Sequence, residues 1–150
     1  MDFKKLANQY RDELLDNVLP FWLEHSQDLE FGGYFSCLDR EGKVFDTDKF
    51  IWLQGREVWM FSMLYNKVEK RQEWLDCAVQ GGEFLKKYGH DGNYNWYFSL
   101  DRSGRPLVEP YNIFSYTFAT MAFGQLSLAT GNQEYADIAK KTFKIILSKV

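Results

Sequence analysis

The sequence predicts an all-α fold, the N-terminal part of an (α/α)6 toroid in which outer and inner helices alternate. Amphipathic segments alternate with segments that are apolar on nearly every side, a pattern typical of surface and buried helices. A motif also repeats, because LDREG at residues 38–42 returns as LDRSG at residues 100–104. Six pairs at a period of about 60 residues need roughly 360–400 residues. We therefore expect residues 1–150 to form a single incomplete segment of about two and a half repeats, from a longer protein.

Hydrophobic periodicity gives the helices in chain order. Residues 2–24, 71–88 and 133–149 carry apolar side chains at steps of three or four and charges on the opposite face, so we expect outer helices there. Residues 51–66 and 112–130 are apolar nearly all round, so we expect buried inner helices.

The connections also alternate between short and long. Gly131 suits the end of one helix and Asn132 the N-cap of the next. The long links, residues 32–48 and 89–111, each hold an Asp-Arg-x-Gly turn beside a short aromatic run. We expect a short β-hairpin in each long link.

Composition narrows the class of protein. With 18 Lys plus Arg against 21 Asp plus Glu, the net charge is −3, which argues against nucleic-acid and polybasic membrane partners. The sequence shows neither a signal-peptide core nor an apolar stretch of ~20 residues. Its two Cys and two His have no metal-ligand spacing. We expect a soluble cytoplasmic protein with reduced thiols, in which Cys77 is a small core residue.

One apolar segment carries a charge that needs an explanation. Trp52, Arg56 and Trp59 share a helix face, and arginine is seldom buried without a partner. An indole plate beside five N–H donors suits a sugar, whose C–H face stacks while its hydroxyls accept hydrogen bonds. The alternative is a buried ion pair between Arg56 and a carboxylate of another helix. The residues alone leave both open.

Residues 52–66 (WLQGREVWMFSMLYN) resemble the N-terminal signature of the N-acylglucosamine 2-epimerase family. The resemblance extends to the flanking segments in the same order: residues 21–28 (FWLEHSQD) with 32–35 (GGYF) before the signature, and 101–106 (DRSGRP) and 113–118 (IFSYTF) after it. The resemblance covers nearly the whole chain and implies a barrel of six α/α pairs, in agreement with the repeat.

The resemblance implies an isomerase that interconverts N-acetylglucosamine and N-acetylmannosamine by deprotonation and reprotonation at C2 of the open sugar. It makes Arg56 the catalytic residue, which holds sugar oxygens and stabilises the enolate. It makes Trp52, Arg56 and Phe114 substrate-binding residues. Phe114 agrees with the N-acylglucosamine branch, because cellobiose 2-epimerases usually carry Tyr near this position.

The two catalytic histidines of the family lie in later repeats and have no counterpart here. We expect His25 and His90 to be structural or solvent-exposed, and these 150 residues alone to be inactive. We expect no cofactor and a homodimer. The resemblance implies ATP as an allosteric effector in some members, but the chain has no Walker-type motif to place it.

Two other functions remain open from the residues. A glycoside hydrolase on the same fold would use carboxylates among Asp39, Asp101 and Glu109, although turn formation also explains the first two. A non-enzymatic carbohydrate-binding module of helix pairs would fold and bind ligand unaided.

Overall fold

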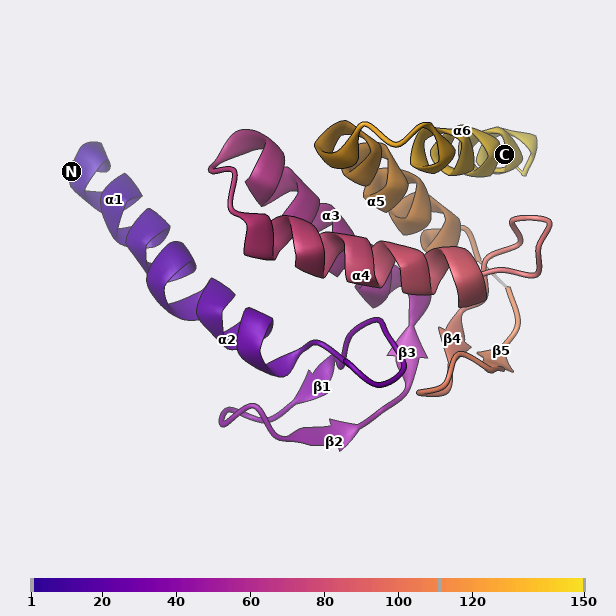
Figure 1. The fold of residues 1–150 in the computed structure, drawn as a ribbon, viewed down its shortest axis with the longest axis horizontal. Coiled ribbons are helices and arrows are strands. Elements are labelled where there is room, and N and C mark those ends of the chain that lie inside the picture. The colour runs from indigo at the N-terminus through magenta and orange to yellow at the C-terminus, as the bar shows by residue number, and fades with distance from the viewer. Residues whose placement is uncertain (1, 111, 150) are drawn as a thin grey trace.

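The computed structural model describes residues 2–110 and 112–149, so Tyr111, the last residue of the second expected link, lies outside the described residues. Figure 1 shows the helices and short strands in chain order. The helical elements are α1 (Phe3–Glu13), the π-helical turn η1 (Leu14–Val18), α2 (Leu19–His25), α3 (Ile51–Lys67), α4 (Gln72–Tyr88), α5 (Phe114–Thr130) and α6 (Gln133–Ser148). The strands are β1 (Cys37–Leu38), β2 (Val44–Asp46), β3 (Lys49–Phe50), β4 (Ser99–Leu100) and β5 (Pro106–Val108).

The two expected inner helices, α3 and α5, lie side by side (Figure 1). Gly55 allows their close approach, because a Cβ atom there would lie 3.0 Å from the backbone of Phe118. The facing sides of the two helices form much of the hydrophobic core, with Val58, Phe61, Ala119, Ala122, Phe123 and Leu126 buried.

The next two outer helices cover this pair. Helix α4 packs against α3 and α5, and α6 packs against α5. The Tyr135 hydroxyl of α6 donates to Glu83 Oε1 of α4 at 2.6 Å, and Lys86 Nζ lies 3.2 Å from Glu134 Oε2. The helices expected at residues 71–88 and 133–149 are therefore confirmed.

Local capping explains where α5 ends and where its neighbours begin. Gly131 adopts a φ of +71°, which costs glycine little, and the Asn132 side chain accepts from the Glu134 amide at 2.9 Å. Helix α5 begins two residues later than expected. The Asn112 side chain accepts from the Phe114 amide at 3.0 Å and so caps the helix from just before its start.

Both expected hairpins form, with β1 antiparallel to β2 and β4 antiparallel to β5. Strand β3 additionally pairs with β4, so the order β3-β4-β5 makes a small sheet that joins the two long links. This pairing was not predicted. It places the start of α3 directly beside the second hairpin.

The inner helices are buried on one side and leave an apolar face uncovered, as part of a toroid should. Phe114 is 64% and Leu128 70% exposed, because the described chain covers only one side of the α3–α5 pair. The stripe of the first helix is also uncovered: Phe3 is 74% and Tyr10 70% exposed, and only Leu19 is buried. Figure 1 shows α1 extending away from α3. No helix in the described part of the chain is long and apolar enough to span a membrane.

Candidate functional site

The first turns of α3 carry the side chains that the sequence singled out. Phe50 caps α3 with extended backbone, and the Ile51 amide donates to the Phe98 carbonyl oxygen at 3.0 Å. This bond ties the start of α3 to the second hairpin. Trp52 and Arg56 follow at a spacing of four and so project from the same side of the helix.

The guanidinium group of Arg56 is exposed beside two aromatic rings. Its Cζ lies 5.9 Å from the ring centroids of both Trp52 and Phe118, within reach of a cation–π attraction. Within residues 2–110 and 112–149 the guanidinium makes no hydrogen bond and no ion pair. The buried ion pair that the sequence left open is therefore absent there, and the N–H donors are available to a ligand.

Four aromatic side chains form an apolar hollow of about 290 Å³ near Arg56, which we call the aromatic box. It is lined by Trp52, Phe98, Phe114 and Phe118. The Trp52 and Phe118 rings lie 5.9 Å apart between centroids at 50°. The structure thus brings together Trp52 and Phe114, the two aromatic residues predicted to bind substrate.

Two members of the aromatic box were not predicted. Phe118 lies one helical turn after Phe114, so helix periodicity could have identified it. Phe98 directly precedes β4, and it reaches the aromatic box only because β3 pairs with β4. No local sequence pattern predicts that pairing of strands.

Arg56 also borders space on other sides of α3. One hollow of about 160 Å³ is lined by Arg56, Trp59, Phe118 and Met121. A larger one of about 370 Å³ is lined by Trp22, Ser36, Leu53, Arg56, Glu57, Trp59 and Met60. The guanidinium therefore faces open volume rather than a packed core, as a ligand-binding cation should.

Glu57 carries an enclosed carboxyl group next to Arg56 in the chain. Its Oε1 lies 2.5 Å from the Ser26 hydroxyl, which itself lies 2.6 Å from the carbonyl oxygen of Trp22. The Ser26 hydroxyl has one proton, which it shares between two acceptors, Glu57 Oε1 and the Trp22 carbonyl oxygen. Burial raises the pKa of Glu57 to about 8, although the Ser26 bond acts in the opposite direction. A neutral Glu57 forms no ion pair with Arg56, so the guanidinium stays available to a ligand.

The two histidines have structural positions, as expected. The ring of His25 packs on Phe21, with centroids 4.9 Å apart. His90 Nδ1 accepts from the Gly92 amide at 3.0 Å, and burial lowers the pKa of His90. Neither lines the hollows around Arg56.

The carboxylates considered for glycoside hydrolysis serve their own turns or are exposed. Asp39 accepts from the amides of Glu41 and Lys43, at 3.0 and 2.8 Å. Asp101 accepts from the Arg105 amide at 2.9 Å, and this bond and others hold the pKa of Asp101 well below its usual range. Such a group is a poor general acid. Among the described residues, no three Asp, Glu, His or Cys side chains gather as a metal site would require.

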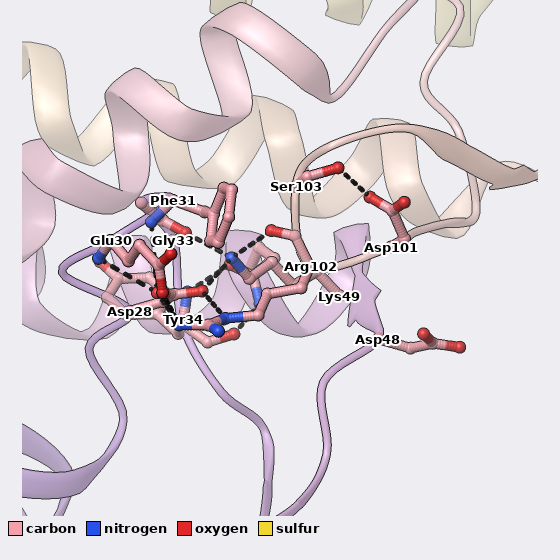
Figure 2. A network of polar contacts seen from close by, with 12 residues as sticks. Asp28, Glu30, Phe31, Gly33, Tyr34, Asp48, Lys49, Asp101, Arg102 and Ser103 are labelled. Atoms are coloured by element: carbon pink, nitrogen blue, oxygen red, sulfur yellow. Dashed lines mark hydrogen bonds and ion pairs between the residues drawn. The ribbon is translucent and has the colours of Figure 1, made fainter.

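An ion cluster lies at β3, just before the start of α3. It consists of buried Asp28 and Lys49 and half-buried Arg102, and we call it the Asp28 clasp (Figure 2). The Lys49 and Asp28 side chains are 0% and 1% exposed. Lys49 Nζ donates to Asp28 Oδ2 at 2.9 Å and to the Gly32 and Arg102 carbonyl oxygens at 2.6 and 2.9 Å. Arg102 donates to both Asp28 oxygens, at 2.9 and 3.0 Å.

The Asp28 clasp connects the first link, β3 and the second hairpin, and the sequence did not predict it. Burial alone would raise the pKa of Asp28, but the hydrogen bonds from Arg102 and Lys49 outweigh burial and lower it to about 2. The repeated Asp-Arg-x-Gly motif points to both Arg40 and Arg102. Only Arg102 joins the clasp, whereas Arg40 is exposed, so the motif alone does not predict the ion cluster.

The chain is similar to known proteins both in sequence and in fold. Residues 33–150 match the sequence profile of the family described as N-acylglucosamine 2-epimerase (GlcNAc 2-epimerase). The N-acylglucosamine 2-epimerase of Mus musculus is 47% identical over 128 residues, 83% of this chain and 30% of that protein. A cellobiose 2-epimerase of Dictyoglomus turgidum is 30% identical over 148 residues, 97% of this chain and 38% of that protein.

The structure of cellobiose 2-epimerase from Bacillus thermoamylovorans superposes with a TM-score of 0.87 at 31% identity. The match covers 95% of this chain and 37% of that one. The predicted alternation of outer and inner helices of an (α/α)6 barrel is thereby confirmed for the chain. The chain spans about a third of the length of the curated relatives it matches.

Proposed function

Because this chain belongs to the N-acylglucosamine 2-epimerase family, we propose that the whole protein inverts C2 of an N-acylated hexosamine. The reaction interconverts N-acetylglucosamine and N-acetylmannosamine. The observation that supports it most is the guanidinium of Arg56, which has no ion-pair partner among the described residues and lies 5.9 Å from the Trp52 and Phe118 rings of the aromatic box.

The chemistry needs a stabilised oxyanion. A base removes the C2 proton of the open-chain sugar, the electron pair moves into the C1–C2 bond, and the C1 carbonyl oxygen becomes negative. Reprotonation of C2 from the opposite face gives the epimer, with no net oxidation or reduction. Donors on Arg56 favour the charged intermediate over the neutral sugar, so they lower the barrier. We assign the bases to parts of the protein beyond these 150 residues.

Two alternatives have less support. Asp39 and Asp101 are bound into their own turns, so they are poor candidates for a hydrolase pair. A non-enzymatic sugar-binding module does not account for the similarity to several named epimerases.

The proposal includes an amino-sugar substrate, a role in carbohydrate metabolism, a cytoplasmic location and a homodimeric state. The absence of a bound cofactor and an allosteric effect of ATP stay predictions.

The test is epimerisation of N-acetylglucosamine by the whole protein in deuterated water, followed by NMR. We expect N-acetylmannosamine carrying deuterium at C2. Arg56→Ala should lower kcat/KM by about 100-fold or more, as the loss of one oxyanion donor does in other enzymes.

Arg40→Ala is the matched control, because Arg40 is an exposed arginine of the first hairpin. It should stay within about twofold of the parent. Equal turnover in the two variants would show that Arg56 is not catalytic. Hydrolysis of a disaccharide without C2 exchange would favour the glycoside hydrolase.

A further inference from the structure

The aromatic box presents a chemical mismatch to an unsubstituted sugar. Its four lining side chains, Trp52, Phe98, Phe114 and Phe118, are all aromatic, and only the indole N–H of Trp52 can donate a hydrogen bond. A hydroxyl placed inside would lose its water partners and find at most that one donor, and none of the four side chains could accept its own proton, which is costly. The box therefore suits an apolar group that projects from an otherwise polar ligand.

The position of Arg56 indicates which group that is. The guanidinium carbon lies 5.9 Å from the centroids of the Trp52 and Phe118 rings. An oxygen on C1 that accepts from Arg56 at about 2.9 Å leaves C2 two bonds away. The acyl carbon and methyl of a C2 amide extend a few ångströms further, a reach comparable to the 5.9 Å that separates the guanidinium carbon from each ring centroid.

We propose that the aromatic box binds the acyl group of an N-acylated hexosamine and sets the preference for acyl length. This inference rests on the proposed function, because it places C1 of the sugar at Arg56. Phe118 is the dividing residue: its ring lines both the aromatic box and the neighbouring hollow that it shares with Trp59 and Met121. Truncating Phe118 should join the two volumes.

The kinetic test uses the whole protein with N-acetyl-, N-propanoyl- and N-butanoyl-glucosamine. Phe118→Ala should lower kcat/KM for the acetyl sugar by about tenfold, since one small apolar contact changes discrimination by 10–200-fold. It should lower kcat/KM for the butanoyl sugar much less, so the butanoyl-to-acetyl ratio rises about tenfold. Phe143→Ala is the control, because Phe143 is an exposed phenylalanine of α6, and it should leave the ratio unchanged.

A second measurement does not depend on turnover. In saturation-transfer NMR with N-acetylglucosamine, the acetyl methyl should receive the strongest transfer from the parent protein. Phe118→Ala should reduce it relative to the ring protons, and Phe143→Ala should not.

The possible outcomes separate the two proposals. An equal loss for every acyl length, or a methyl signal unchanged in Phe118→Ala, overturns the acyl site while epimerisation still supports the function. A strong methyl signal without epimerisation supports the acyl site and contradicts the proposed reaction.

Discussion

At the residue scale, two neighbouring ionisable groups of α3 have opposite environments. Arg56 is exposed and has no ion-pair partner within the described residues, whereas Glu57 is only partly exposed and accepts a hydrogen bond from Ser26. Successive helix residues point about 100° apart, so adjacent side chains can face a ligand site and an enclosed space. A protonated Glu57 carries no charge and therefore does not pair with Arg56.

Glu57 should make stability fall as the pH rises. Burial raises the pKa of Glu57 to about 8 in the folded protein, so between its ordinary value and pH 8 the folded state binds more protons than the unfolded chain. The free energy of unfolding then decreases by at most about 1.4 kcal/mol per pH unit in that window. Glu57→Gln should flatten this slope in denaturant titrations at pH 5, 6, 7 and 8.

Glu109→Gln, at an exposed carboxylate, is the control and should keep the slope of the parent protein. An unchanged slope in Glu57→Gln would mean that the carboxyl is already ionised at neutral pH.

At the element scale, β3 and the second hairpin determine where α3 begins. The Ile51 amide bonds to Phe98, and the Asp28 clasp holds Lys49 two residues earlier. Strand pairing and the clasp thus act on adjacent residues. They fix the first turn of α3, which carries Trp52 into the aromatic box.

Arg102→Met should destabilise the protein by about 2 kcal/mol, because buried Asp28 loses two charge-assisted hydrogen bonds while keeping Lys49. Arg40→Met removes the equivalent residue of the first repeat, which is exposed, and should cost less than about 0.5 kcal/mol. Urea unfolding of the whole protein measures both changes. Similar losses in the two variants would show that the clasp contributes little.

At the scale of the whole molecule, the described chain leaves apolar surfaces at its edges. The stripe Phe3, Tyr10 and Leu14 of the first helix is exposed, as is Leu128 at the end of α5. Exposed apolar surface of this kind favours association.

The 150 residues alone should therefore self-associate. Light scattering should show a mass that increases with concentration, and the double variant Tyr10→Glu, Leu14→Glu should reduce it. The control, Gln133→Glu and Ser148→Glu, adds the same two negative charges at exposed positions of α6 and should have little effect. A monomer at every concentration would show that the stripe is not an association surface.

Features that depend on neighbours along the chain could be predicted from the amino-acid sequence. Helix alternation follows from periodicity, the hairpins from their Asp-Arg-x-Gly turns, and the end of α5 from Gly131 and Asn132. The pairing of Trp52 with Arg56 on one face follows from helical spacing. These signals are local, so a few residues contain each of them.

The tertiary structure alone decided what distant segments do to one another. Asp28 meets Arg102 and Phe98 reaches Trp52 only after the two long links close against each other. Such contacts form only when segments far apart in the chain come together, so no periodic pattern in the sequence predicts them. The same reason applies to Glu57, whose neutral state depends on enclosure by residues from other parts of the chain.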